Sequence, residues 1–204
     1  MNVKDFTKDI KRKYDNHCAY LWGGSGQVVS KTTLGTIIDM EDSKAHAVKV
    51  VKHVADMIDK GYNLDKAQFF DCSGNIVDSL NKFGICKGDL RANDLFVMGT
   101  SISLKNAKEG DLVFNGEPTH KNHVGYVAED GKVYECKGRD YGMYISKVED
   151  WQYAARYTWF DDFKLTRKLK LTKPAMSGAD VMNLQKALGS HGFPCAITGT
   201  FTEN

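Results

Sequence analysis

The apolar residues in the first half of the chain recur at the spacing of amphipathic helices. Three segments show this pattern and predict helices over residues 3–14, 43–60 and 72–83. Ser43 is a residue type that caps helix N-termini, and Gly84 follows the third segment as a C-terminal glycine does. The stripes that we expect to face the core are Phe6, Ile10 and Tyr14 in the first segment, Val48, Val51, Ala55 and Ile58 in the second, and Ile76, Val77, Leu80 and Phe83 in the third.

The second half of the chain changes to the alternation and turn chemistry of β-strands. A short helix is predicted over residues 93–98 before this change, and Asp130-Gly131 has the composition of a hairpin turn. Residues 20–26 are predicted to form a glycine-rich turn after aromatic residues. Strands are predicted over residues 111–114, 123–128, 132–136, 143–148 and 153–160. Helices followed by an antiparallel meander predict an α+β fold.

The C-terminal segment is predicted to be a small separate unit. Alternating Lys and Leu over residues 164–174 predict a last edge strand that leads into a linker, with Pro174 as its end. A helix is predicted over residues 178–188, with Val181, Leu184 and Leu188 on its apolar face and Gly192 closing it. The predicted organisation is therefore a main domain over residues 1–165, a basic linker over 166–174 and a partial module over 175–204.

Composition is that of a packed globular protein. The chain has 204 residues, of which 42% are hydrophobic and 26% charged, with three prolines, and this excludes a disordered or fibrous chain. Its length allows one sizeable domain with a small appendage. We expect no membrane insertion, because no apolar run approaches the ~18 residues of a membrane span, and the first residues lack the apolar stretch of a secretory signal.

Charge is distributed unevenly along the chain. Residues 164–204 carry six Lys/Arg and two Asp/Glu, whereas residues 1–163 carry 22 and 24. A cationic tail on a nearly neutral body is expected to attract a polyanion such as nucleic acid, anionic lipid or an anionic wall polymer. A nucleic-acid role would depend on the basic linker alone, which lacks interleaved aromatic residues, so no nucleic-acid partner is expected.

The cysteine content points away from disulfides and metal sites. Five cysteines at wide spacing, with no Cys-x-x-Cys pair, indicate neither a disulfide framework nor a structural zinc site, and at least one thiol is free. No metal and no cofactor is expected. The cysteines are Cys18, Cys72, Cys86, Cys136 and Cys195.

Cys72 is the strongest candidate for chemistry. In the segment Phe70-Asp71-Cys72-Ser73-Gly74 it falls at a predicted helix N-terminus, where unpaired N–H groups and the helix dipole lower a thiol pKa. The alternative is a small buried core residue. His123, at the start of a predicted strand, is the candidate base. His120, in the polar loop predicted over residues 117–122, is a rival that we expect to be solvated.

These residues give the chain a resemblance to the NlpC-type cell-wall cysteine peptidases of the papain-like clan. The resemblance covers residues 8–160 and implies a papain-like fold, with N-terminal helices packed on an antiparallel sheet. The matching segments are Tyr20-Leu21-Trp22-Gly23-Gly24, Asp71-Cys72-Ser73-Gly74, Lys108-Glu109-Gly110-Asp111-Leu112-Val113-Phe114 and His123-Val124-Gly125, followed by the Asp130-Gly131 hairpin.

The resemblance also implies roles for individual residues. Cys72 would attack the scissile carbonyl, and His123 would give its proton to the departing amine. The Cys72 backbone N–H and the Tyr20 hydroxyl would stabilise the oxyanion. The residues expected to line the substrate groove are Asp71, Ser73 and Trp22.

The chain departs from the family pattern at two places. Residues 26–69 are longer than the usual connection before the nucleophile and are expected to wall one side of the cleft. Glu135 stands where the family often has a histidine, twelve positions after the base. A two-residue turn at 130–131 would place Glu135 on the sheet face opposite His123, whereas a three-residue connection over 129–131 would place both on one face. The spacing favours the second, with Glu135 orienting the imidazole; otherwise Glu135 is an ordinary surface carboxylate.

The tail resembles the first part of a three-helix peptidoglycan-binding module. The residues after 204 that would form the module's last helix are not in this sequence, and thirty residues bury little core. We therefore expect the piece to lean on the main domain, to stay mobile or to be the stump of a longer product. The basic linker is expected to contact anionic wall polymers.

The predicted function is hydrolysis of an amide bond in bacterial peptidoglycan by a monomeric thiol hydrolase. The expected bond is the D-glutamyl–diamino acid bond of the stem peptide. Two alternatives are an N-acetylmuramoyl-L-alanine amidase with the same chemistry and a non-catalytic wall-binding or phage tail protein. The layout resembles that of a phage lysin, made in the host cytoplasm and released through a membrane lesion or carried on the virion.

Overall fold

The computed structural model describes residues 2–160, 168–190 and 196–201, in two units that divide after Phe160. The helices of the first unit are α1 (Val3–Asp15), α2 (Lys31–Ile37), α3 (Lys44–Asp59), α4 (Cys72–Lys82) and α5 (Ala92–Met98). Its strands are β1 (Ala19–Tyr20), β2 (Ser25–Val28), β3 (Gln68–Phe70), β4 (Thr100–Ile102), β5 (Leu112–Glu117), β6 (His120–Val127), β7 (Lys132–Gly138), β8 (Gly142–Lys147) and β9 (Tyr153–Arg156).

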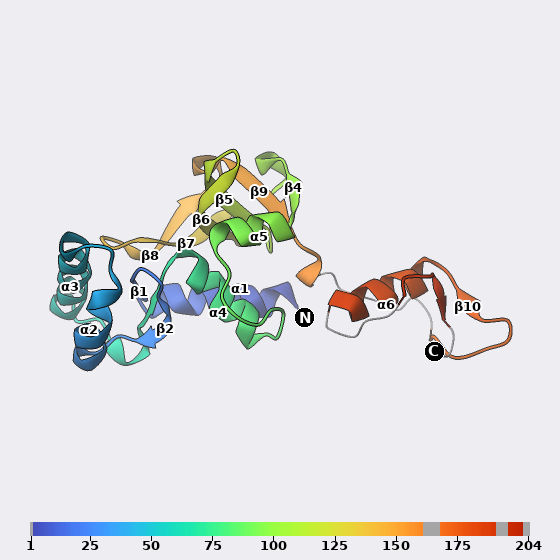
Figure 1. Ribbon diagram of the computed structural model, residues 1–204, viewed down its shortest axis with the longest axis horizontal. Helices are drawn as coiled ribbons and strands as arrows, with labels where there is room; N and C mark the ends of the chain where they lie inside the picture. Colours follow the sequence, from blue (N-terminus) through green and yellow to red (C-terminus); the bar gives the residue numbers. More distant parts are fainter. Residues whose placement is uncertain (1, 161–167, 191–195, 202–204) are drawn as a thin grey trace. The chain divides into compact units, whose positions relative to one another are not determined.

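A six-stranded antiparallel sheet forms one layer of the first unit, and helices pack against it (Figure 1). The strand order is β4-β9-β5-β6-β7-β8. Phe6 and Ile10 on α1, Leu80 on α4, and Phe114 and Tyr126 on the sheet are all fully buried in the shared core. Burying each large apolar side chain contributes about 1.5–3 kcal/mol. The predicted α+β class is confirmed.

A buried lysine joins α1 to α4. Lys13 is fully buried, and its ammonium lies 2.8 Å from the Asp78 carboxylate. It also donates to the Ser79 hydroxyl at 2.8 Å and to the Asn75 carbonyl at 2.5 Å. Burial lowers the pKa of Lys13, against the opposing influence of Asp78. Because these three partners all lie on α4, they fix the position of α1 against that helix.

A second, smaller core lies beneath α3. Residues 20–26, predicted as a turn, contribute instead to a three-stranded sheet of order β1-β3-β2, in which β1 runs parallel to β3. Strands of two to four residues carry no periodic signal in the sequence, and they exist here through long-range pairing. Ala19 and Phe69 from this sheet, and Leu21 directly after β1, share a buried cluster with Val50 and Val54 of α3.

The predicted inner face of α3 is wrong. The helix buries Val50, Val54 and Met57, whereas three members of the predicted stripe are exposed and Ala55 lies on the outer side with them. The exposed fractions are 66% for Val48, 47% for Val51 and 53% for Ile58. The helix is apolar on two faces, so spacing could not decide which one meets the sheet.

Three boundaries in the second half also differ from prediction. Residues 117–122 do not form a loop, because β5 and β6 continue to a tight hairpin in which Glu117 pairs with His120. The last strand ends at Arg156, and residues 158–160 form a 3-10 helix. Residues 164–167 of the predicted edge strand lie outside the described residues, and residues 168–174 form no strand, since none of the described strands pairs with them.

The second unit contains a helix and a small hairpin-like pairing. Its elements are α6 (Ala179–Ser190), β10 (Met176–Ser177) and β11 (Thr200–Phe201). Val181 on the predicted apolar face is fully buried and Leu188 is 36% exposed; Gly192 lies outside the described residues. The predicted main domain over residues 1–165, linker over 166–174 and module over 175–204 stay predictions. Residues 161–167, around the first of these boundaries, lie outside the described residues. No described helix is long and apolar enough to cross a membrane.

Two helical glycines provide a matched stability test. A Cβ on Gly74 would lie 2.1 Å from the Gly24 carbonyl oxygen, whereas a Cβ on Gly35 would meet nothing within 4 Å. We expect Gly74→Ala to lower the free energy of unfolding by about 1–3 kcal/mol through overpacking. Gly35→Ala should raise it by ~0.5 kcal/mol, because alanine favours the helix. Urea unfolding of both variants measures the difference, and equal effects would contradict this account of the α4 packing.

Candidate active site

Cys72 is the first residue of α4. The carboxylate of Asp71 caps the helix by accepting the Gly74 N–H at 2.6 Å and also accepts the Gly23 N–H at 3.2 Å. Burial raises the pKa of Asp71, against the opposing effect of these hydrogen bonds. The half-buried thiol of Cys72 thus sits at the positive end of the helix dipole, as predicted from the sequence.

Glycines let the β1–β2 loop contact the start of α4. The Gly24 carbonyl accepts the Asp71 N–H at 2.9 Å, and a Cβ on Gly24 would lie 2.9 Å from Phe70. Gly74 faces the same carbonyl from within the helix. This close backbone contact is the physical reason for the Gly-Gly and Cys-Ser-Gly segments.

His123 lies on β6 and reaches both Cys72 and Glu135. It is the fourth residue of the strand, not the first as predicted. Its Nε2 lies 2.6 Å from the Glu135 carboxylate. The Cys72 thiol contacts the residue before His123, donating to the Asn122 carbonyl at 3.8 Å, and lies close enough to raise the pKa of the imidazole. Because Nε2 is engaged by Glu135, Nδ1 is the nitrogen left for the sulfur. The structure therefore brings the three residues together in one chain of contacts.

The register of the β6–β7 hairpin decides the position of Glu135. Tyr126 pairs with Tyr134, and the Ala128 N–H donates to the Lys132 carbonyl at 2.8 Å. Residues 129–131 therefore form a three-residue connection, the predicted alternative that places Glu135 on the same face as His123. Only 4% of the Glu135 side chain is exposed.

The imidazole is held in its protonated form. Burial lowers the pKa of His123, but hydrogen bonds and charge interactions with Cys72 and Glu135 outweigh it and raise the pKa to about 9. At neutral pH the ring is therefore an imidazolium between two acidic groups. A cation held beside a thiol is a feature that cysteine nucleophiles use.

Trp151 is a further part of the site that the sequence analysis missed. Its ring stacks on His123 with 5.2 Å between centroids and 9° between planes, and its Nε1 donates to the Ser146 hydroxyl at 3.1 Å. A Cβ on Gly125 would lie 2.8 Å from this ring. Gly125 was the sequence feature that could have indicated this contact. It lies two residues after His123, on the same face of β6, and its missing side chain leaves room for a large ring there.

The other predicted site residues lie around the start of α4. Tyr20 is the register partner of Phe70, is 8% exposed, and its hydroxyl forms no hydrogen bond with the described residues. Burial and the charges of Cys72 and Asp71 raise the Tyr20 pKa, so the phenol stays a proton donor.

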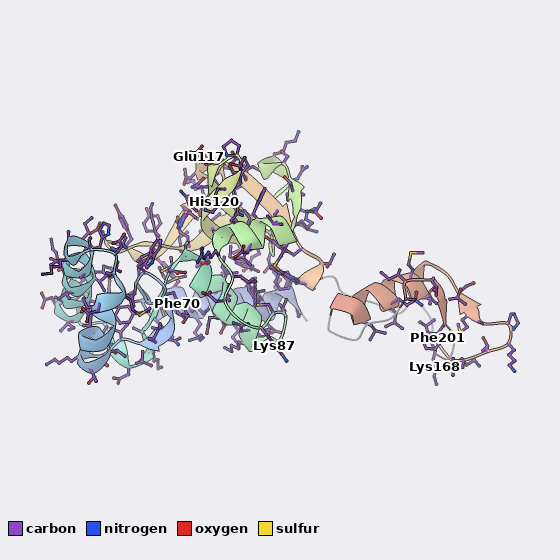
Figure 2. All side chains as sticks on the ribbon, viewed as in Figure 1. Phe70, Lys87, Glu117, His120, Lys168 and Phe201 are labelled. Carbon is purple, nitrogen blue, oxygen red and sulfur yellow. The ribbon has the colours of Figure 1, made fainter. Side chains whose placement is uncertain are left out.

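Trp22 is 54% exposed, and Ser73 is 8% exposed and donates to the Asp71 carboxylate at 3.2 Å. The rival His120 lies at the end of the β5–β6 hairpin beside Glu117 (Figure 2).

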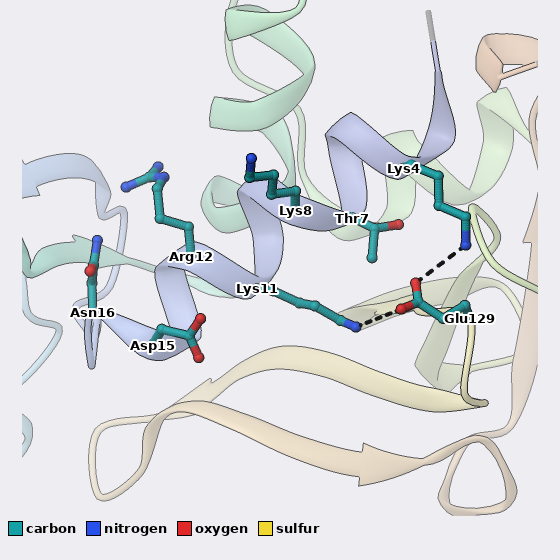
Figure 3. Close-up of a pocket in the computed structure, with 8 residues that line it drawn as sticks. All are labelled: Lys4, Thr7, Lys8, Lys11, Arg12, Asp15, Asn16 and Glu129. Atoms are coloured by element: carbon teal, nitrogen blue, oxygen red, sulfur yellow. Dashed lines mark hydrogen bonds and ion pairs between the residues drawn. The ribbon is translucent and has the colours of Figure 1, made fainter.

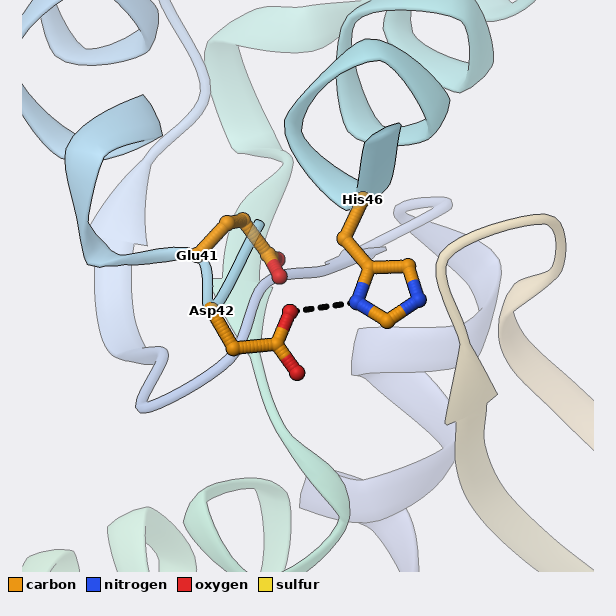
Figure 4. Close-up of side chains that lie close together, drawn as sticks. All are labelled: Glu41, Asp42 and His46. Carbon is orange, nitrogen blue, oxygen red and sulfur yellow. Dashed lines mark hydrogen bonds and ion pairs between the residues drawn. The ribbon is translucent and has the colours of Figure 1, made fainter. Parts of the chain in front are cut away.

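Neither of two other polar features contains the predicted site residues. A pocket of 530 Å³ on α1 is lined by four cationic and two carboxylate side chains, among others (Figure 3). It is lined by Lys4, Thr7, Lys8, Lys11, Arg12, Asp15, Asn16 and Glu129. Glu41, Asp42 and His46 come close enough to share a metal ion, and Asp42 bonds to His46 (Figure 4). The Arg139 guanidinium, however, already supplies a cation to both carboxylates.

Comparison with known proteins places this geometry in a family. Residues 59–160, half of the chain, match the NlpC/P60 family and include Cys72, His123 and Glu135. The NlpC/p60 domain of the peptidoglycan hydrolase SagA is 18% identical, with a TM-score of 0.49, over 77% of this chain and 100% of that chain. No match is found among curated proteins.

Two mycobacterial structures are also similar. The P60 domain of an antigen from M. avium subspecies paratuberculosis is 20% identical over 74% of this chain and 96% of its own, with a TM-score of 0.44. RipD from Mycobacterium tuberculosis, described as a non-catalytic NlpC/p60 domain protein adapted to peptidoglycan binding, is 26% identical over 43% and 66%, with a TM-score of 0.36. With its α+β, papain-like fold, the chain belongs to the NlpC/P60 family.

Proposed function

We propose that the protein is a cysteine peptidase that hydrolyses an amide bond in the stem peptides of bacterial peptidoglycan. The observation that carries the proposal is the contact chain from Cys72 through His123 to Glu135, located at the N-terminus of α4. A family member without activity would have no need for a buried carboxylate to hold the histidine charged beside a thiol.

The proposed reaction has two halves. In the first, the Cys72 sulfur attacks the carbonyl carbon, and the oxygen becomes an oxyanion that accepts hydrogen bonds from the Cys72 N–H and the Tyr20 hydroxyl. The His123 imidazolium then donates its proton to the leaving nitrogen, which departs as an amine and leaves a thioester on Cys72. In the second half, His123 takes a proton from water and the hydroxide adds to the thioester carbonyl. The C–S bond then breaks, the acid product leaves, and the sulfur is released beside His123, which again carries its proton.

The free hydroxyl of Tyr20 supports its proposed role. Two other buried tyrosines use theirs within the fold, since Tyr126 shares a hydrogen bond with Thr7 at 2.6 Å and Tyr157 donates to the Leu95 carbonyl at 2.6 Å. The buried Tyr134 hydroxyl also forms no hydrogen bond with the described residues, but its ring contacts α1, whereas Tyr20 lies near Cys72. A buried phenol normally finds such a partner. We therefore assign the unfilled donor of Tyr20 to the substrate.

The proposed bond is the D-glutamyl–diamino acid bond of the stem peptide. The alternative, an amidase that cuts between the sugar and the peptide, would use the same residues. After digestion of purified walls, mass analysis of the released fragments separates the two. A new amino group on the diamino acid supports the endopeptidase, and one on the first alanine supports the amidase.

The biological setting is a further part of the proposal. We propose a monomeric phage lysin, acting on the wall after release through a membrane lesion or as part of the virion. The cationic C-terminal segment, with six Lys/Arg over residues 164–204, supports contact with anionic wall polymers.

Replacing the nucleophile tests the activity. Cys72→Ala should lower fragment release from purified walls by about 10³-fold or more, because the variant lacks the sulfur proposed to form the thioester. Cys86→Ala, which removes another half-buried free thiol, should retain wild-type release. Equal release by Cys72→Ala and wild type would contradict the proposal and favour a non-catalytic wall-binding protein.

The dependence of kcat/KM on pH tests the role of Glu135. The pKa of His123 lies above its ordinary value of 6.5, at about 9, so the charged pair persists at neutral pH and is lost as pH rises through about 9. We expect kcat/KM to fall above that pH. Glu135→Gln removes one cause of the raised pKa and should move this fall to lower pH. Glu117→Gln, at the exposed hairpin end, should leave the profile unchanged; an unchanged profile in Glu135→Gln would exclude its role.

A further inference from the structure

Ion pairs join the segment between β2 and β3 to the β7–β8 hairpin. This segment, residues 29–67, contains α2 and α3 and makes up most of the added length noted in the sequence over residues 26–69. On its outer side, Lys49 on α3 pairs with Asp140 at 2.8 Å, and both side chains are about half exposed, at 51% and 55%. Figure 1 shows the hairpin reaching toward α3.

A second and buried contact joins the same two elements. The side chain of Glu41 is fully buried, although it carries a carboxylate, and Arg139 from the hairpin donates its Nε to it at 2.7 Å. Burial of a charge is unfavourable unless it is paired and hydrogen-bonded, so this pair must form for the surrounding chain to pack.

The Glu41–Arg139 pair also holds the chain on both sides of the proposed oxyanion donor. The other carboxylate oxygen of Glu41 accepts the Trp22 N–H at 3.0 Å. The guanidinium of Arg139 lies over the ring of Tyr20, 5.4 Å from its centroid. The ion pair thus contacts two residues that are two positions apart in the chain: Arg139 contacts Tyr20, and Glu41 contacts Trp22.

We propose that Glu41 and Arg139 are positioning residues that hold Tyr20 and Trp22 against Cys72. This inference rests on the proposed function, since it takes Tyr20 as the oxyanion donor. The added segment is then part of the catalytic apparatus, because it supplies Glu41. A donor placed by a rigid pair stabilises the transition state more than the ground state, so its displacement lowers kcat and leaves KM nearly unchanged.

A double-mutant cycle tests this proposal. We expect Tyr20→Phe to lower kcat by about 10²-fold and Glu41→Gln by about 10-fold, each with KM within twofold of wild type. If Glu41 acts through Tyr20, the double variant should be no slower than Tyr20→Phe alone. Multiplicative losses in the double variant, or wild-type kcat in Glu41→Gln, would overturn the proposal.

Lys49→Ala is the matched control. It removes the exposed ion pair between the same two elements but contacts neither Tyr20 nor Trp22. Its kcat should equal that of wild type. A loss in Lys49→Ala as large as in Glu41→Gln would mean that docking of the segment, not positioning of Tyr20, is responsible, and would overturn the proposal. Circular dichroism and thermal melting of each variant check that it is folded.

Amide exchange at Trp22 gives a readout that needs no turnover. By NMR, the Trp22 N–H should exchange about tenfold faster in Glu41→Gln than in wild type, and at the wild-type rate in Lys49→Ala. An unchanged rate in Glu41→Gln would overturn the positioning role. Wild-type protein that releases nothing from walls would instead refute the proposed peptidase activity, so the two failures are distinguishable.

Discussion

The contact between the β1–β2 loop and the first turn of α4 is the constraint on which the site depends. The Gly24 carbonyl accepts the Asp71 N–H at 2.9 Å, and Gly74 leaves no side chain between the two backbones. This contact sets where α4 begins, and therefore where the Cys72 thiol meets the helix dipole. It also brings Tyr20, on the strand before the loop, near the thiol.

Around this contact, a buried carboxylate twice pairs with a cation on another element. At His123, the almost fully buried carboxylate of Glu135 holds a cation on the neighbouring strand. At Arg139, the buried carboxylate of Glu41 holds a cation on the hairpin and accepts a backbone N–H. In both cases a carboxylate on one element fixes a group on another, and burial makes the loss of either partner costly.

The sequence was sufficient for the residues whose positions follow from local rules. Cys72 was placed at a helix start by the apolar stripe over residues 76–83 that follows it. The spacing of twelve residues from His123 favoured the hairpin register that puts Glu135 on the histidine's face. The boundaries of α1, α3 and α4 followed from periodicity and caps. These features depend on contacts within a few residues or on strand parity.

The features that escaped prediction depend on distant contacts. The strands β1 to β3 are too short to show alternation, and α3 has two apolar faces, so only the packed structure selects the face that carries Val50 and Val54. Trp151 meets His123 because β9 is preceded by a turn that returns to the sheet, and no local pattern encodes that approach. Glu41 and Arg139 are separated by almost one hundred residues.

The proposed nucleophile and base lie in different layers of the fold, so partial loss of tertiary packing would separate them. Cys72 belongs to a helix and His123 to the sheet, so their contact exists only while the two layers are docked. A loosened state of the kind reached in acid keeps most secondary structure but loses fixed side-chain packing. Far-ultraviolet spectra would register little change in such a state, while the thiol would lose its imidazolium. The reactivity of this sulfur is thus a more sensitive gauge of native packing than helix content.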